Sequence, residues 1–337
     1  MVCSFFLGAN TPNGFYSLFS ELDNYDLSVI KGGSGSGKST LIRKLIDKTN
    51  YSGLCEQILC SSDPDSLDGA VFHSLNSAVV DGTAPHIADV KGFGKYILTP
   101  PPVIDMESKR ALINTLKSAK TKAYADAYSS LSGYYNALKS IKKLIPFNNK
   151  QFEQRADGII KREAKNKRTQ GKLHRRFIDS IAADGIVTLW DTVSQLAQKV
   201  YLIDDRFGLA SSFMENLETG FISNGYEVYS CLSPFDISSI RHIIIPELSL
   251  AFVTSDELSQ YKGNIFRNIH ISSCIDKKAL RAVRQKVRLY EKLADQMLKD
   301  AVSSFANARL AHTELENAYR PYLDIDALNK LAEAEKM

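Results

Sequence analysis

A run of glycine, lysine and hydroxyl residues near the N-terminus carries the clearest chemical signal in the chain. It reads KGGSGSGKST and contains the pattern GxxxxGK[ST], with Gly32, Gly37, Lys38 and Ser39 at the defining places. Glycines let backbone N–H groups turn around phosphate oxygens, and a following helix N-terminus adds partial positive charge. The pattern predicts a phosphate-binding loop in which lysine bridges the β and γ phosphates and serine ligates Mg²⁺. The predicted nucleotide-binding residues are Gly32, Gly33, Ser34, Gly35, Ser36, Gly37, Lys38, Ser39 and Thr40.

Two acidic segments follow this loop. The apolar run SAVVD ends at Asp81, where a strand would place a carboxylate beside the loop to hold the water shell of magnesium. The segment CSSDPDSLDG follows the expected strand CEQIL and carries Asp63, Asp65 and Asp68. One of these carboxylates could orient an attacking water or hydroxyl or take its proton, although turn chemistry alone also explains Ser, Asp, Pro and Gly. The predicted catalytic residues are Lys38, Asp63, Asp65 and Asp81, and the predicted magnesium ligands are Ser39 and Asp81.

The segments around the loop have the periodicity that positions it. DLSVI, residues 26–30, is short, apolar and β-branched, which is typical of a buried strand. In the following LIRKLIDK, the residues Leu41, Ile42 and Leu45 fall on one face of a helix. Strand, glycine loop and helix are the context that this motif requires.

Composition excludes several classes of protein. The chain has 337 residues, of which 44% are hydrophobic and 24% charged, as in a globular protein with room for two domains. Its five cysteines form no CxxC pair and its six histidines are scattered, which argues against a zinc site or a disulfide framework. We read no signal peptide and no apolar run long enough for a membrane span, so we expect a cytoplasmic protein without membrane contact.

Positive charge is concentrated in the middle of the chain. Residues 139–176 contain thirteen Lys and Arg and three acidic residues, a net charge of +10 in a chain whose total is +4. This stretch is either a solvated helix and linker, the commoner case, or a surface for nucleic acid or an acidic partner, or a source of an arginine for the γ-phosphate. Only Phe147 and Phe152 interrupt the charges, so stacking on single-stranded nucleic acid has little support.

The sequence also contains an internal repeat at an offset of 171 to 173 residues. The matched pairs are Gly14 with Gly185, Ile30 with Leu202, Cys60 with Cys231, and Asp65 with Asp236. On this alignment Gly32, Gly37, Lys38 and Ser39 correspond to Asp204, Leu209, Ala210 and Ser211, and Asp81 to about Thr254. Acidic residues in place of a phosphate-binding glycine repel phosphate, so we expect no triphosphate in the second copy.

The motifs FFLGANTPNG, KGGSGSGKSTL, CSSDPDSLDG and DGTAPH, in this order, resemble those of a bacterial family of tandem P-loop ATPases. The resemblance spans essentially the whole chain and implies a P-loop NTPase fold and ATP, with no particular substrate. Nothing in the residues themselves favours adenine over guanine. The SDPDSLD loop is similar, more weakly, to the acidic loop of uridine-kinase-like enzymes.

We therefore expect an α/β fold with two tandem P-loop NTPase-like units, each with a mostly parallel sheet and a following helical hairpin. The expected divisions are an intact unit at 1–103, a basic helical hairpin at 104–171, a degenerate unit at 172–272 and a second hairpin at 273–337. Tyr124, Tyr128 and Leu131 form a stripe that we expect to pack in a core. The hairpins could cap the nucleotide, join the units or form a homodimer.

Three functions are compatible with these residues. The first is hydrolysis of Mg²⁺-ATP, and the second is a small-molecule kinase that transfers the γ-phosphate to a hydroxyl acceptor. The third is a nucleotide-gated binding module for a nucleic acid or protein partner.

Overall fold

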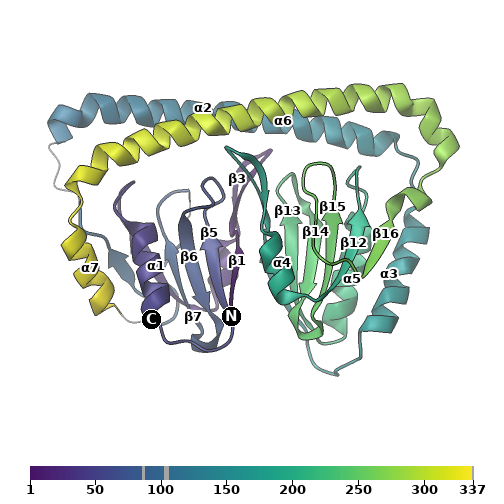
Figure 1. Ribbon diagram of the computed structural model, residues 1–337, viewed down its shortest axis with the longest axis horizontal. Helices are drawn as coiled ribbons and strands as arrows, with labels where there is room; N and C mark the ends of the chain where they lie inside the picture. Colours follow the sequence, from purple (N-terminus) through teal and green to yellow (C-terminus); the bar gives the residue numbers. More distant parts are fainter. Residues whose placement is uncertain (86–87, 102–105, 336–337) are drawn as a thin grey trace.

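The chain forms two α/β units beneath a long pair of helices (Figure 1). The computed structural model describes residues 1–85, 88–101 and 106–335. The first six-stranded sheet consists, in spatial order, of β1 (Val2–Phe5), β5 (Cys55–Leu59), β6 (Leu67–Phe72), β7 (Ser77–Asp81), β4 (Asp26–Lys31) and β8 (Tyr96–Leu98). Strand β6 is antiparallel to both neighbours and the remaining pairs are parallel, so the sheet is mixed but mostly parallel.

The second sheet repeats this order and these directions. It consists of β9 (Lys172–Arg176), β13 (Glu227–Ser233), β14 (Asp236–Ile245), β15 (Leu250–Ser255), β12 (Lys199–Asp204) and β16 (Arg267–His270), with β14 antiparallel to its neighbours. Each unit also has a small hairpin, β2 (Gly8–Thr11) with β3 (Gly14–Ser17) and β10 (Asp179–Ala182) with β11 (Gly185–Thr188). The α-helices that lie within the two units are α1 (Lys38–Lys48), α4 (Trp190–Leu196) and α5 (Ser211–Ser223).

The strand registers correct the alignment of the two loops by one residue. Ile30 lies opposite Asp81 in the first sheet, and Ile203 lies opposite Thr254 in the second. Helix α1 begins at Lys38 and α5 begins at Ser211, so the offset across the loop is 173 residues instead of the expected 172. The counterparts of Gly32, Gly37, Lys38 and Ser39 are therefore Asp205, Ala210, Ser211 and Ser212. Sequence matching misplaced them because glycine and hydroxyl residues tolerate a one-residue slip without losing similarity.

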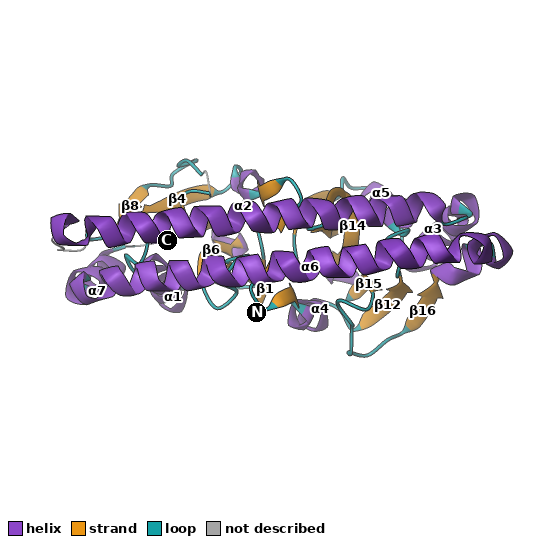
Figure 2. Ribbon diagram, turned by 90° about the horizontal axis from the view of Figure 1, so that it is seen from above, coloured by secondary structure: helices purple, strands orange, loops and turns teal. Residues whose placement is uncertain are grey.

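The long helices do not form the two hairpins that we expected. Helix α2 (Met106–Leu144) instead runs antiparallel to α6 (Lys277–Tyr319) across both units (Figures 1 and 2). Helix α3 (Asn149–Glu163) continues from α2 and packs on α5 of the second unit, whereas α7 (Ile325–Ala334) follows α6 and packs on α1 of the first. Helix α3 thus follows the first unit but packs on the second, and α7 follows the second unit but packs on the first. Helices α2 and α6 pair with each other because a long amphipathic helix buries its apolar stripe best against an equally long partner.

The interior of this pair confirms the tyrosine stripe. Leu131 is buried in a cluster that joins both helices, and Tyr124 and Tyr128 pack edge-on against Phe305 of α6. At the loop end, Leu41, Ile42 and Leu45 of α1 are buried together with Leu328 of α7. The expected strand, loop and helix at residues 26–48 are thus present.

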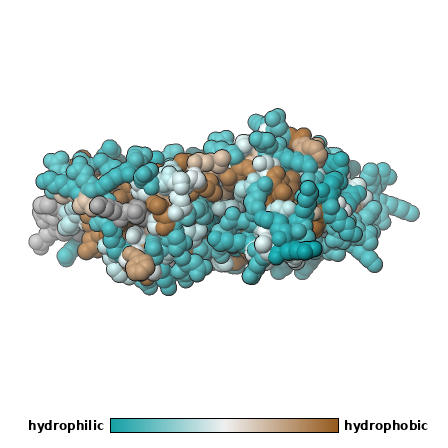
Figure 3. Space-filling model, turned by 90° about the horizontal axis from the view of Figure 1, so that it is seen from below, coloured by the Kyte–Doolittle hydropathy of each residue, from teal (hydrophilic) through white to brown (hydrophobic). Residues whose placement is uncertain are grey.

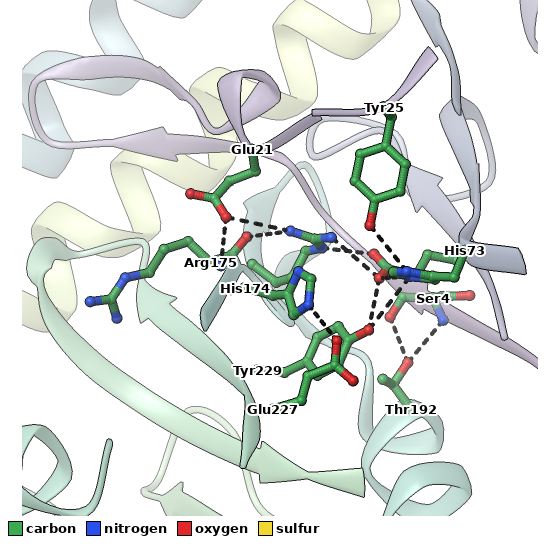
Figure 4. A network of polar contacts seen from close by, with 11 residues as sticks. Ser4, Glu21, Tyr25, His73, His174, Arg175, Thr192, Glu227 and Tyr229 are labelled. Atoms are coloured by element: carbon green, nitrogen blue, oxygen red, sulfur yellow. Dashed lines mark hydrogen bonds and ion pairs between the residues drawn. The ribbon is translucent and has the colours of Figure 1, made fainter. Parts of the chain in front are cut away.

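The two units meet through paired backbone and a buried polar network. Phe6 and Phe177 exchange two backbone hydrogen bonds of 2.8 and 2.9 Å between the units. Around them, Glu56 and Arg176 form a fully buried ion pair, with Arg176 Nε 2.7 Å from Glu56 Oε2. Figure 4 shows His73 and Tyr229 converging on the same centre, and both contact Glu56. Burial of this pair ties the relative position of the two units to a specific hydrogen-bonding geometry.

All five cysteines are free thiols, and four of them are buried. Across residues 1–85, 88–101 and 106–335, no helix is both long and apolar enough to cross a bilayer. The face opposite the helix pair is largely hydrophilic with some hydrophobic patches between the polar side chains (Figure 3).

Candidate nucleotide site

The phosphate loop lies at the carboxyl edge of the first sheet, between β4 and α1. Gly35 and Gly37 have φ values of +68° and +81°, a left-handed conformation that side chains other than glycine rarely adopt. Within the described residues, the N–H groups of Gly35, Gly37 and Lys38 donate to no protein acceptor. Free amides at a helix N-terminus form an anion-binding cradle.

Lys38 and Asp81 come together at this edge, as the sequence predicted. Lys38 Nζ donates to the carbonyl oxygens of Gly33 at 2.8 Å and Gly32 at 3.3 Å, and lies 3.6 Å from Asp81 Oδ2. Their side chains are only 9% and 16% exposed. Asp81 Oδ1 also accepts from the backbone N–H of Thr83 at 2.8 Å, which fixes the carboxylate. Parallel pairing of β4 with β7 produces this meeting, because both strands end at the same edge.

The other predicted residues lie around this pair with different exposures. Ser39 Oγ accepts from the backbone N–H of Leu67 at 2.9 Å, so the start of β6 sits against the start of α1. Asp63 is half-buried, and its carbonyl oxygen accepts from Ser66 in a turn. Asp65 is exposed, and its carbonyl accepts from Arg43. These contacts involve the backbone of the loop and leave both the turn and the site interpretations open.

Helices α2 and α6 cover the loop, which is one of the roles that the sequence left open for the helical segments. A Cβ atom added to Gly35 would lie 3.3 Å from Glu316 Cα of α6, so helix backbone touches loop backbone. Burial and the charges of Lys117 and Lys38 lower the pKa of Lys120 on α2. Burial and the charge of Lys120 likewise lower the pKa of His312 on α6. Lys120 and His312 therefore lie close to each other and to Lys38, on the two helices that cover the loop. Sequence reasoning missed them because no local motif marks residues that lie far away along the chain.

The second loop shares a left-handed glycine with the first but contains its own anion. Gly208 has a φ of +65°, close to that of Gly35 at the equivalent place. Asp205, the counterpart of Gly32, accepts hydrogen bonds from the backbone N–H groups of Leu209 at 2.6 Å and Ala210 at 3.0 Å. Burial raises the pKa of Asp205, although these N–H groups and Lys142 favour its ionised form. An internal carboxylate thus takes the amides that a phosphate would need.

Within the described residues, four of the thirteen Lys and Arg of the basic stretch at 139–176 form ion pairs. Examples are Lys167 with Glu247, Arg175 with Glu218 and Arg176 with Glu56. Phe152 is fully buried against Phe213, so its ring is unavailable for stacking on a base. These contacts favour the solvated-helix and packing interpretation for that part of the charge.

Comparison with known proteins agrees with the loop geometry. The sequence model of the viral superfamily 1 RNA helicase core domain matches residues 28–88. This segment runs from β4 through the loop and α1 to just beyond β7, and it contains both Lys38 and Asp81. No curated protein and no solved structure matches the chain. Residues 28–88 therefore form a P-loop NTPase core, which is a nucleotide-binding fold.

Proposed function

We propose that the N-terminal unit binds Mg²⁺-ATP through residues 32–40 and hydrolyses it. The observation that carries this proposal is the position of Lys38 Nζ, held at the loop by two carbonyl oxygens and 3.6 Å from Asp81. A lysine in this place can move from these carbonyls to the β and γ phosphates when a nucleotide arrives. The choice of ATP over other nucleoside triphosphates rests on the family resemblance.

Ser39 and Asp81 are the proposed magnesium ligands. A hydroxyl and a carboxylate are oxygen donors of the kind that Mg²⁺ prefers, and the ion usually completes its shell with water and phosphate oxygens. In keeping with this small donor set, the described residues contain no cluster of three or more His, Cys, Asp or Glu side chains arranged to hold a metal. Bound magnesium would supply charge neutralisation on the phosphates.

Asp63 is the better candidate of the two acidic-loop residues for orienting the attacking water. The charge of Asp63 acts to raise the pKa of His312 on the covering helix α6, whereas the side chain of Asp65 is exposed. A small-molecule kinase would use the same carboxylate for a hydroxyl acceptor. Labelled γ-phosphate separates the two: hydrolysis releases it as inorganic phosphate in buffer alone, and transfer requires an added metabolite pool that becomes labelled.

The direct test compares Lys38→Ala with Ser211→Ala, the variants at equivalent positions in the two units. We expect Lys38→Ala to weaken ATP binding by about a hundredfold or more and to abolish phosphate release, because it removes the ammonium group that contacts the β and γ phosphates. Ser211→Ala should leave both unchanged. Calorimetric titration with ATP and GTP measures affinity and base preference together. Equal effects of the two substitutions would refute the proposal.

A second candidate, a nucleotide-gated binding module, is favoured by the contact of Gly35 with Glu316. A bound γ-phosphate beside this contact would press on α6, which runs the length of the molecule. Such a module would bind ATP with negligible turnover, and a nucleic-acid partner would show salt-sensitive binding that is lost when charges between Lys161 and Arg168 are neutralised.

We also propose that the two units are tandem copies of one P-loop-like unit, of which only the first keeps a working loop. The common strand order of the sheets and the shared turn glycines support this proposal. It predicts one ATP per chain in the calorimetric titration.

A further inference from the structure

A large cavity lies at the end of the helix pair away from the phosphate loop. Its volume is about 1030 Å³, the size of a pocket for a small-molecule ligand. It lies between the carboxyl edge of the second sheet and helices α2 and α6, the place that the nucleotide site takes in the first unit. Lining residues come from the second loop, from β14 and β15, and from both long helices.

Six acidic and six basic side chains line the cavity, so its formal charges balance, but they are not all paired with one another. Its acidic side chains all have partners: Asp256 and Glu291, for example, pair with Arg241 and Arg206. The remaining acids contact N–H, hydroxyl or basic groups as well: Asp205, Asp236, Glu257 and Asp295. By contrast, Lys139, Arg288 and Lys292 line the cavity and, in the described chain, pair with no carboxylate. The cations without a carboxylate partner lie on α2 and α6, so this side of the cavity can pair with a negatively charged group of a ligand.

The floor of the cavity contains a hydroxyl group that lacks a partner. Thr254 is 3% exposed, and among the described residues its Oγ1 has no hydrogen-bond partner. It occupies the place of Asp81, at the end of the equivalent strand. A buried hydroxyl without a partner costs free energy, which a ligand oxygen or nitrogen would recover. The loop amides beside it are already taken by Asp205.

The walls also contain apolar surface. Tyr135 and Phe207 are partly buried, whereas Leu258 and Leu289 are 43% and 57% exposed. Rings and aliphatic side chains around a pocket favour a ligand with a flat or apolar body, since an inorganic anion alone would leave this apolar surface exposed to water.

We propose that this cavity binds a phosphorylated ring compound of nucleotide size, with its phosphate on Lys139, Arg288 and Lys292 and its polar ring edge at Thr254. Binding here is inverted relative to a P-loop: the helices hold the phosphate, because Asp205 excludes it from the loop. This site does not depend on nucleotide binding in the first unit.

The test uses the full chain carrying Lys38→Ala, which removes the first loop from the measurement. Calorimetric titration with the ribonucleoside 5′-monophosphates and with pyridoxal 5′-phosphate, beside inorganic phosphate, should show at least one ring compound binding at roughly 1 mM or tighter. Arg288→Ala with Lys292→Ala should weaken that binding about tenfold or more, because two charge-assisted contacts are lost. Thr254→Val should weaken it while leaving the unliganded protein at least as stable, since an unsatisfied hydroxyl is removed.

The matched control is Arg281→Ala with Arg284→Ala, which removes the same charge from the same helix outside the cavity. It should leave binding unchanged. The proposal is overturned if no ring compound binds, if inorganic phosphate binds equally well, or if the two double variants weaken binding to the same extent.

Discussion

The loops at residues 32–37 and 205–210 occupy equivalent places and have opposite chemistry. Their backbones differ at the last residue, where Gly37 has a φ of +81° and Ala210 a φ of −77°. In the first, Gly32 leaves no side chain, and a Cβ atom there would lie 2.0 Å from Thr99 Oγ1. In the second, Asp205 at the same place folds its carboxylate onto the loop amides. This carboxylate, together with the right-handed conformation of Ala210 where Gly37 is left-handed, separates a closed turn from an anion-binding cradle. The loss of the lysine, replaced by Ser211, is therefore only part of the difference.

The interface between the units shows a second contrast of this kind. Strand registers make Arg176 the counterpart of Phe5, and Glu56 the counterpart of Tyr229. One pair is a buried ion pair, and the other is a stack with ring centroids 5.3 Å apart. Equivalent places can therefore hold the units together by different physics, and the following experiments examine each contrast.

The largest effect should come from breaking the ion pair. Arg176→Met leaves the Glu56 carboxylate buried without its charge partner, and we expect a loss of about 3–5 kcal/mol of unfolding free energy. Tyr229→Phe, which removes only one hydrogen bond to the same carboxylate, should cost about 1 kcal/mol. Urea unfolding of both variants measures the difference. Similar losses would mean that packing, and not charge, joins the units at this point.

The same pair should give the protein a pH dependence. Burial alone would raise the pKa of Glu56, but the Arg176 charge and hydrogen bonds from His73 and Arg176 lower it to about 2. Because this pKa lies below its ordinary value of 4.5, the ionised group stabilises the fold above that pH, and the contribution is lost as pH falls toward about 2. Unfolding free energy measured from pH 6 to pH 2 should fall less steeply for Glu56→Gln than for the unaltered protein.

Asp179 makes a second acid-dependent contribution to stability, which the Glu56→Gln substitution leaves in place. Burial would raise its pKa, but His242 and Arg241 lower it to about 2, so it loses stabilisation over nearly the same pH range. Glu56→Gln should therefore retain part of the slope. If its slope equals that of the unaltered protein, the ion pair does not govern acid stability.

A smaller effect should distinguish the two turn glycines. Gly35→Ala and Gly208→Ala both place a side chain at positive φ, which costs about 1–2 kcal/mol. At Gly208 the nearest neighbour is the flexible end of Lys142, which can move away, whereas at Gly35 it is the backbone of Glu316. Thermal unfolding should therefore show a greater loss for Gly35→Ala. Equal losses would indicate that α6 is free to shift away from the loop.

The smallest effect is a gain of function in the second loop. Asp205→Gly frees the amides of Leu209 and Ala210, and Ser211→Lys restores the missing charge. Together they should produce weak pyrophosphate binding, roughly millimolar, in a Lys38→Ala background. Ser211→Lys alone should not bind, because Asp205 still occupies the amides. Titration of the single and double variants decides whether one carboxylate closes this loop.

Local patterns predicted the parts of this molecule that depend on neighbours in sequence. The strand at 26–31, the loop and the helix from Lys38 all follow from periodicity and glycine spacing. Asp81 was placed beside Lys38 because parallel strands end at one edge. The pairing of α2 with α6 could not be predicted, since both helices have apolar stripes that fit several partners equally well and only the assembled sheets select one.

By itself, the sequence predicted a loop with the residues that hold a phosphate and a weaker resemblance to it in the second half of the chain, because backbone freedom and charge at single positions are local properties. Only the tertiary structure decided that the second loop is closed by Asp205, that α6 rests on Gly35, and that a cavity with unpaired cations opens under the far end of the helices. These features join residues separated by up to about 280 positions, and their geometry depends on how whole sheets and helices pack.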